Sequence, residues 1–290
     1  MTPSGSAVTT APAPDLDAYF GRIGVPGVHG SGGSDPDLAT LSRIVLGHAE
    51  SITYENLDKF TGHDIQLDLE ALTTKLVRGR RGGGCFEQNL LLHAVLDALG
   101  YTTSFLTGRV VWNLPADAPM RARLHMLLRV DLPEGPHIVD VGFGILTLTG
   151  VLALEPEVEQ ATPHEPFRLM PDGPVYVMEA LLGGKWRALY RFDLSEAYFA
   201  DFAMASWYNA HHPRSLLVNE LVIARPDVDR RYTLSGSKDR GVRFSVRHLA
   251  GQSEYRTLES RPKIRAVLEE QFRLDLSGLP DLDAALARLY

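Results

Sequence analysis

The chain contains a single cysteine, Cys85, within the stretch RGRRGGGCFEQN at residues 78–89. Three glycines precede it and would allow a sharp turn and a close approach of substrate. The apolar pattern after the cysteine predicts a helix that begins there, and the free N–H groups of a helix N-terminus stabilise a thiolate. A buried cysteine that only fills space needs no glycine-rich approach. The pattern therefore favours a nucleophile, with Arg78, Arg80 and Arg81 expected to add positive potential.

A nucleophilic thiol needs a base, and His125 is the best candidate among ten histidines because it interrupts the apolar strand pattern RLHMLLRV. Alternation along that strand places His125 on the face opposite Met126. The following pattern, HIVDVGFG, carries Asp140, and DLPEGP between the two is a hairpin turn signal. In any odd-sum register, such as Leu132 opposite His137, His125 and Asp140 project from the same face, whereas an even-sum register separates them.

Asp140 lies within an apolar run, where burying a carboxylate is costly unless a polar group pairs with it. His125 would supply that partner, since an imidazole can donate a ring N–H to the carboxylate. A thiol, an imidazole and a carboxylate acting together are one arrangement for nucleophilic catalysis. The pattern agrees equally well with a structural His–Asp hydrogen bond, so the residues alone leave both interpretations open.

The overall composition argues against several classes of protein. The formal net charge of −7 disfavours a general nucleic-acid binder, and one cysteine cannot form an internal disulfide. The N-terminal stretch MTPSGSAVTTAPAPD lacks the basic start and apolar core of a secretory signal and predicts a disordered lead-in. No run approaches the roughly 18 apolar residues of a membrane span. We therefore expect a cytoplasmic protein that binds neither nucleic acid nor membrane.

Hydrophobic periodicity divides the chain into three predicted domains of an α+β fold. Helical patterns dominate residues 1–100, with Asp35 as a predicted N-cap and Gly100 as a C-terminal glycine. Alternating patterns joined by Pro, Gly and Asp dominate residues 101–202 and predict a mostly antiparallel sheet. Residues 203–290 combine strand patterns, including SLLVNELVIARP, with the helical patterns RPKIRAVLEEQF and LPDLDAALARLY.

Several motifs resemble those of the arylamine N-acetyltransferase family. ITYENLD (52–58) is similar to the family's IPFENL-type segment, and RGGGCFEQN (81–89) is similar to its RGGxCFExN signature. HMLL matches the family's H-x-x-L, DVGFG (140–144) matches its aspartate strand, and HPRSLLVNELVIARP resembles the opening of its third domain. The motifs occur in the family's order from about residue 50 onward, so the chain resembles bacterial members of this family.

The resemblance implies a catalytic triad of Cys85, His125 and Asp140. It also implies an N-terminal helical bundle, a central antiparallel β-barrel and a C-terminal α/β lid around a cysteine-protease-like core. The family uses acetyl-CoA in a ping-pong reaction: the thiolate takes the acetyl group, CoA leaves, and an arylamine, hydrazine or arylhydroxylamine attacks the acetyl-cysteine. Asp140 would then orient His125, and the backbone N–H of Cys85 would donate to the oxyanion.

The resemblance also suggests residues that contact the substrates. Tyr54 and Phe143 match aromatic positions that line the family's acceptor pocket. Trp112 and Gly144 match positions that approach CoA in bacterial members. Core packing is the other explanation for the aromatic side chains, and for Tyr54 it is equally good.

Arg81 and Glu55 match an arginine and a glutamate that we expect to form a structural ion pair. The chain also departs from the family pattern at three positions. Gly84 stands before the cysteine in place of an aromatic residue, and Tyr54 and Leu217 each stand in place of phenylalanine. These changes bear on the identity of the donor acyl group and of the acceptor amine.

Other functions remain compatible with the sequence. The amide-synthase branch of the same family uses the same triad to close polyketide chains into macrolactams, with an acyl chain supplied by a carrier protein. A thiol protease is a further alternative, which the long C-terminal segment disfavours. The alternative from another class is a non-enzymatic binding module with an inert cysteine. No zinc-ligand spacing, Walker P-loop or G-x-S-x-G elbow is present, so we expect no metal, and the sequence indicates no oligomeric state.

Overall fold

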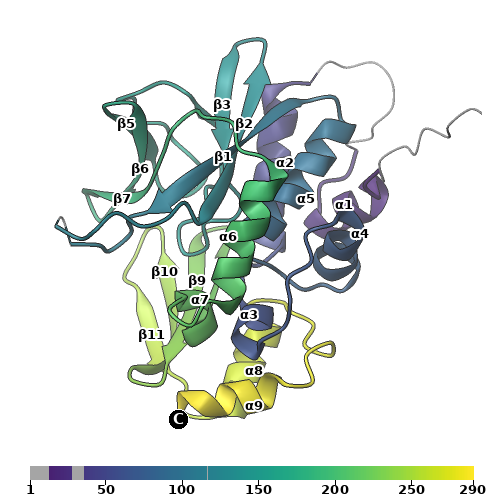
Figure 1. The fold of residues 1–290 in the computed structure, drawn as a ribbon, viewed down its shortest axis with the longest axis vertical. Helices are drawn as coiled ribbons and strands as arrows, with labels where there is room; N and C mark the ends of the chain where they lie inside the picture. Colours follow the sequence, from purple (N-terminus) through teal and green to yellow (C-terminus); the bar gives the residue numbers. More distant parts are fainter. Residues whose placement is uncertain (1–12, 28–35, 116) are drawn as a thin grey trace, which may run out of the picture.

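The computed structural model describes residues 13–27, 36–115 and 117–290. These residues form a helical part, a barrel-like sheet and a smaller α/β part, which confirms the predicted α+β fold class (Figure 1). The predicted N-terminal lead-in falls almost wholly outside the described residues. Among the residues that the structure describes, no helix is long and apolar enough to cross a membrane.

The helical part precedes the sheet and ends with the helix that begins at the cysteine. Its second helix is capped by Asp37, whose carboxylate accepts the N–H of Thr40 at 2.8 Å. The predicted cap, Asp35, is therefore wrong by two residues, and it lies outside the described residues. Gly100 has a φ of 86°, as a C-terminal glycine should. The elements are α1 (Leu16–Ile23), α2 (Leu38–Ser51), α3 (Leu57–Thr61), α4 (Leu69–Leu72), the π-helix η1 (Thr73–Arg78) and α5 (Cys85–Ala98).

A seven-stranded antiparallel sheet follows, in the order β4-β3-β2-β1-β7-β6-β5. The chain leaving β4 crosses to the opposite edge, where Glu157 donates its N–H to the carbonyl of Leu169 at 2.8 Å and Gln160 pairs with Phe167. This connection covers both edges and nearly closes the sheet into a barrel. The strands are β1 (Thr102–Val110), β2 (His125–Leu132), β3 (Gly135–Val139), β4 (Leu152–Ala153), β5 (Phe167–Asp172), β6 (Val175–Leu182) and β7 (Lys185–Phe192).

Strands β2 and β3 form the predicted hairpin. Leu132 pairs with Gly135, which is an odd-sum register, although the example pairing of Leu132 with His137 is wrong by two residues. Parity alone decides which side chains share a face, so the shift leaves the predicted faces intact. β2 is buried on both sides, with Met126 packed against the helices and Leu127 inside the barrel. Burial on both faces explains why this strand is almost continuously apolar.

The C-terminal part contains a four-stranded sheet, in the order β11-β10-β9-β8, and the last helices. The pattern SLLVNELVIARP was expected to be one strand, but Ser215 accepts the N–H of Leu217 at 3.3 Å and starts a short helix. The strand begins only at Leu221. The elements are α7 (Leu216–Asn219), β8 (Leu221–Asp227), β9 (Arg230–Ser237), β10 (Gly241–His248), β11 (Glu254–Thr257), α8 (Arg261–Glu270), α9 (Leu282–Leu286) and the 3-10 helix η2 (Ala287–Leu289).

Helix α6 (Phe199–His211) connects the barrel to the C-terminal part and runs across the front of the molecule in Figure 1. The sequence patterns did not predict it. Its apolar residues lie on exposed faces as well as buried ones, since Met204 and Trp207 are 71% and 62% exposed while Phe202 is fully buried. That distribution obscures the helical period. The predicted boundary between residues 202 and 203 falls inside this helix, and the division into three domains stays a prediction.

A buried ion cluster joins the barrel to the four-stranded sheet. Glu165, just before β5, accepts Nε and Nη2 of Arg231 at 2.8 and 2.5 Å, and it also pairs with Arg247. Glu165 and Arg231 are both buried. Burial would raise the pKa of Glu165, but the two arginines outweigh that effect and lower it to about 2. The carboxylate is therefore charged at neutral pH.

We predict that Glu165→Gln lowers the free energy of unfolding by about 3 to 5 kcal/mol at neutral pH, because it leaves Arg231 buried without its counter-charge. In the wild type this contribution is present above the ordinary pKa of 4.5 and is lost as the pH falls towards 2. Denaturant unfolding across this pH range measures both effects. The exposed Glu159 provides the control variant Glu159→Gln. Equal stabilities of the two variants at neutral pH would contradict the prediction.

Candidate active site

Three residues that the sequence singled out lie together where α5 meets the sheet. Cys85 is the first residue of α5, His125 is the first residue of β2, and Asp140 follows the last residue of β3. Nε2 of His125 is 2.6 Å from Oδ2 of Asp140. Cys85 also interacts with His125, since it is among the groups that raise the pKa of this histidine. Because the carboxylate holds Nε2, the remaining ring nitrogen, Nδ1, is the one left for the thiol.

The histidine and the aspartate form a buried ion pair. His125 is 3% exposed and Asp140 is fully buried. Burial alone would lower the pKa of His125, but the Asp140 carboxylate and Cys85 raise it to about 10. Burial would likewise raise the pKa of Asp140, yet His125, the N–H of Gly142 and Asn89 hold it below its ordinary value. At neutral pH the imidazole is therefore protonated and the carboxylate is ionised.

Close packing explains the glycines before Cys85. None of the three has a positive φ, and a Cβ at Gly82 would lie 1.8 Å from the carbonyl oxygen of Thr53. A Cβ at Gly83 would meet the side chain of Glu87, and one at Gly84 would lie 2.9 Å from Nζ of Lys59. A side chain at any of the three positions would therefore displace its neighbours, so packing within the fold requires glycine here.

Two of the three arginines near the cysteine, Arg78 and Arg81, form ion pairs with carboxylates. Arg81 donates Nε and Nη2 to Oε1 of Glu55 at 3.0 and 2.7 Å and contacts Asp58 at 3.0 Å, which confirms the predicted structural ion pair. Arg78 pairs with Glu70 at 2.9 Å on the surface. The charges of these two side chains are thus balanced by nearby carboxylates, so they add less positive potential at the thiol than expected.

Buried charges surround the first turn of α5. Oε2 of Glu87 accepts the N–H of Gly84 at 2.8 Å and the ammonium of Lys59 at 3.0 Å, and Oε1 accepts Lys75 at 2.5 Å. Burial would raise the pKa of Glu87, but the two lysines lower it to about 2. This cap fixes the backbone immediately before Cys85.

Aromatic side chains form a wall around His125. The ring of Phe143 lies edge-on to the His125 ring, with 5.3 Å between the ring centroids. The ring of Tyr190, from β7, has its centroid 4.7 Å from that of His125. The pKa of Tyr190 is raised by burial and by the Asp140 carboxylate, so its hydroxyl stays protonated. Phe143 is partly buried, whereas Tyr190 is fully enclosed.

The remaining predicted contact residues lie around the same region. Burial and then Cys85 are the main causes that raise the pKa of Tyr54, which places this phenol within electrostatic range of the thiol. Gly144 has a φ of 87°, and a Cβ there would lie 3.0 Å from the Tyr54 ring, so packing and backbone conformation both call for glycine. Trp112 is partly buried and packs against the hydrophobic core of the barrel.

Asn89 is a further residue of the site that was not predicted from the sequence, and it lies four residues after Cys85 on the same helix. Its side chain contacts Asp140, Met126, Val141 and the carbonyl of Cys85. The spacing of four residues on a helix, which places two side chains on one face, was the available signal. Tyr190 and Glu87 gave no comparable signal, since their contacts depend on strand pairing and on the fold of η1 and α3.

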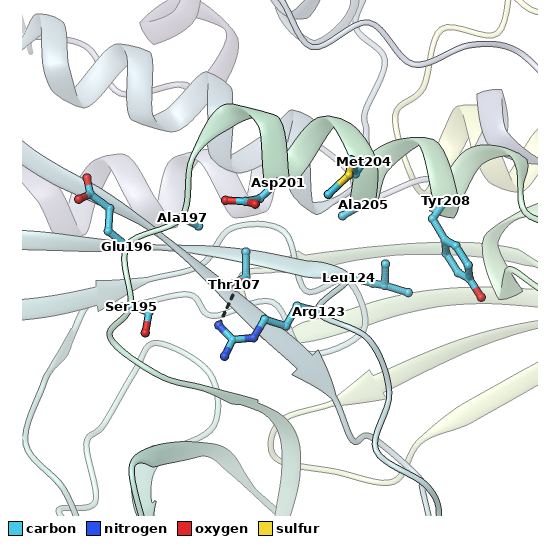
Figure 2. A pocket seen from close by; sticks show the side chains of 10 residues that line it. All are labelled: Thr107, Arg123, Leu124, Ser195, Glu196, Ala197, Asp201, Met204, Ala205 and Tyr208. Atoms are coloured by element: carbon cyan, nitrogen blue, oxygen red, sulfur yellow. Dashed lines mark hydrogen bonds between the residues drawn. The ribbon is translucent and has the colours of Figure 1, made fainter.

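A hollow of about 450 Å³ lies between α6, strand β1 and the segment that precedes β2. Figure 2 shows Asp201 and Met204 of α6 on one side of it and Arg123 and Leu124 on the other. The carbonyl of Leu124 accepts from Sγ of Cys85 at 3.8 Å, so the hollow borders the backbone of the site. The residues predicted to contact acceptor and CoA do not line it. Among the described residues, no three His, Cys, Asp or Glu side chains are arranged to hold a metal ion.

Comparison with known proteins places this chain in a family. A family model described as N-acetyltransferase matches residues 37–280. The arylamine N-acetyltransferase of Mycolicibacterium smegmatis is 40% identical over 93% of this chain and 96% of its own length. The arylamine N-acetyltransferase / N-hydroxyarylamine O-acetyltransferase of Salmonella typhimurium is 35% identical over 91% of this chain and 90% of its own.

The fold agrees with solved structures. The arylamine N-acetyltransferase of Mycobacterium marinum in complex with CoA superposes with a TM-score of 0.86 at 36% identity, covering 95% of this chain and 99% of that one. The likeness therefore extends over the helices, the barrel and the C-terminal part together. This chain belongs to the arylamine N-acetyltransferase family.

Proposed function

We propose that this chain is an acetyl-CoA-dependent N-acetyltransferase that passes the acetyl group through a Cys85 thioester to an arylamine, hydrazine or arylhydroxylamine. The observation that carries the proposal is the thiol at the start of α5 beside the buried His125–Asp140 ion pair. The CoA complex of the M. marinum relative supports the donor. The name of the S. typhimurium relative supports arylamine and N-hydroxyarylamine acceptors.

In the first half-reaction, Cys85 reacts as a thiolate paired with the His125 imidazolium. Sγ attacks the carbonyl carbon of the acetyl thioester, and the new S–C bond forms as the bond to the CoA sulfur breaks. The backbone N–H of Cys85, at the helix N-terminus, has no hydrogen-bond partner among the described residues and donates to the developing oxyanion. His125 gives its proton to the departing CoA sulfur, which leaves acetyl-Cys85 and a neutral imidazole.

In the second half-reaction, the acceptor nitrogen or hydroxylamine oxygen attacks the carbonyl carbon of acetyl-Cys85. His125 takes the proton that the attacking atom loses, and the S–C bond breaks. The acetylated product leaves with the acetyl group, and Cys85 returns to the thiolate paired with the imidazolium. His125 therefore acts as acid in one half and as base in the other.

Asp140 keeps its charge through both halves. It accepts from Nε2 of His125, which orients Nδ1 towards the thiol and stabilises the imidazolium. We propose that Tyr54 and Phe143 contact the acceptor, because the first lies near the thiol and the second packs edge-on to His125. We propose Trp112 and Gly144 as positions on the CoA side, as the family resemblance implies.

The first prediction concerns the nucleophile. Incubation with acetyl-CoA and no amine should add one acetyl group, which peptide mass spectrometry should locate on Cys85, and Cys85→Ser should abolish turnover. A simple arylamine should then discharge the acetyl group. An acetyl group on a lysine would contradict the mechanism. Acetyl-CoA that leaves the protein unmodified indicates a binding module, and little turnover with the arylamine indicates an amide synthase.

The second prediction concerns activation of the thiol. We expect Cys85 to be alkylated quickly well below the pKa of about 8.5 of a free cysteine, because the imidazolium and the helix N-terminus stabilise the thiolate. The pair should persist until the pH rises through about 10, where His125 loses its proton. His125→Ala should remove the reactivity at low pH. His137→Ala, at another buried histidine of the hairpin, is the control. An unchanged pH profile in His125→Ala would rule out this histidine as the partner.

The third prediction separates a catalytic from a structural Asp140. Asp140→Asn keeps the shape of the side chain but removes the counter-charge and can hold the wrong tautomer of His125. In a serine enzyme with this arrangement the change costs about 10⁴-fold in rate, and we expect a loss of at least that order in single-turnover acetylation. Circular dichroism checks folding, and Asp131→Asn, on the same hairpin and half-exposed, is the control. A folded Asp140→Asn with the wild-type rate would make this residue structural only.

A further inference from the structure

We infer that Asn89 is a positioning residue that holds Asp140, and through it His125, in place relative to Cys85; this inference rests on the proposed acetyl transfer. Asn89 lies one turn after the cysteine on α5 and is completely buried. None of the hydrogen bonds that Asn89 makes with described residues goes to the thiol or to the imidazole. Its effect would therefore reach the reaction only through the groups that it holds.

The amide of Asn89 bonds to the helix of Cys85, to the strand of His125 and to the loop of Asp140. Nδ2 donates to the carbonyl of Met126 at 2.8 Å, to the carbonyl of Cys85 at 3.2 Å and to Oδ1 of Asp140 at 3.2 Å. Oδ1 of Asn89 accepts the N–H of Val141 at 3.2 Å. The three partners of Nδ2 are all acceptors and the partner of Oδ1 is a donor, so the orientation of the amide is determined.

The hydrogen-bond donors to Asp140 come from different elements, and Asn89 differs from the others in coming from α5. Oδ2 of Asp140 is occupied by His125, and Oδ1 accepts from Asn89 and from the N–H of Gly142. Gly142 is two residues from Asp140 and belongs to the same loop, so its N–H moves with the carboxylate. Of the hydrogen bonds that described residues donate to this carboxylate, only the bond from Asn89 comes from α5. It therefore ties the carboxylate to the helix that carries the nucleophile.

The same side chain also holds the strand of the histidine. Met126 follows His125, and its carbonyl receives the shortest of the Asn89 hydrogen bonds. Asn89 thus fixes the distance from α5 both to β2 and to the loop after β3. The adjacent amide, Gln88, is equally buried but bonds to His48 and to carbonyls of the segment before α3 and of the glycine loop. Orientation of the triad is accordingly assigned to Asn89 and not to buried amides in general.

The titratable groups around this point determine how the inference can be tested. His125 faces Asp140 from β2, Cys85 faces His125 from α5, and Tyr190 and Tyr54 approach from β7 and from the segment before α3. Both tyrosines stay protonated across the neutral range, because burial raises the pKa of each. A change in the pH profile of Cys85 alkylation therefore reports on the thiolate–imidazolium pair.

The experiment compares wild type with Asn89→Ala and Asn89→Asp. The alanine removes all the hydrogen bonds, and the aspartate keeps the shape but places an acceptor against three acceptors. We expect both variants to lose about 100-fold in single-turnover acetylation of Cys85, the scale of a misplacement of about 1 Å. We also expect the midpoint of the alkylation profile to move to higher pH, because a misoriented carboxylate stabilises the imidazolium less.

The control removes a comparable contact of the same helix. Nδ1 of His93 on α5 is 2.6 Å from the hydroxyl of Thr103 on β1, so Thr103→Val breaks a link between α5 and the sheet away from Asp140. This variant should keep the wild-type rate and midpoint. Thermal unfolding reports the stability of all variants.

Three results would overturn the inference. One is a folded Asn89 variant with the wild-type rate and midpoint. Another is a variant with reduced stability and rate but an unchanged midpoint, which makes Asn89 structural only. The third is failure of both variants to fold, which would also make Asn89 a structural residue only. Failure of the wild type to acetylate Cys85 would instead refute the proposed function itself, so the two failures are distinguishable.

Discussion

The burial of one carboxylate, Asp140, constrains the rest of the structure. An isolated charge in the interior carries a large desolvation cost, and only a counter-charge with further hydrogen bonds can offset it. Here the counter-charge is His125 on β2, and the further donors are Asn89 on α5 and the backbone N–H of Gly142. A helix, a strand and a loop must therefore meet at one point. The register of the β2–β3 hairpin and the placement of α5 are both determined by the same requirement.

A second buried charge limits what the helix N-terminus can do for the thiol. The carboxylate of Glu87 lies in the first turn of α5 and accepts the N–H of Gly84, so part of the positive potential there is already compensated. Lys59 and Lys75 in turn balance Glu87. These contacts at the helix end therefore serve mainly to hold α3, η1 and α5 together. The imidazolium of His125 is therefore the main positive charge that acts on Cys85, and the helix N-terminus adds a smaller contribution.

Local patterns predicted the parts of the fold that depend on local physics. The apolar run of α5, the turn between β2 and β3 and the parity that places His125 and Asp140 on one face could all be read from neighbouring residues. The helix α6 and the role of Asn89 could not, because each depends on surfaces that only tertiary packing brings together. The close packing of the glycines before Cys85 could not be predicted for the same reason. Their missing side chains make room for Thr53, Glu87 and Lys59, which come from other segments.

The C-terminal part is bound to the site by backbone hydrogen bonds and is not a separable cover. Tyr54 exchanges two backbone hydrogen bonds with Ala224 of β8, at 3.0 and 2.9 Å, while the next residue, Glu55, donates to the carbonyl of Gly83 at 3.1 Å. One short segment therefore pairs with the C-terminal sheet on one side and with the glycine loop on the other. Because that loop leads directly into Cys85, the position of the nucleophile depends on β8 as well as on α5. The same pairing sets the Tyr54 ring against Gly144, so the geometry around the thiol requires all three parts of the chain to be assembled.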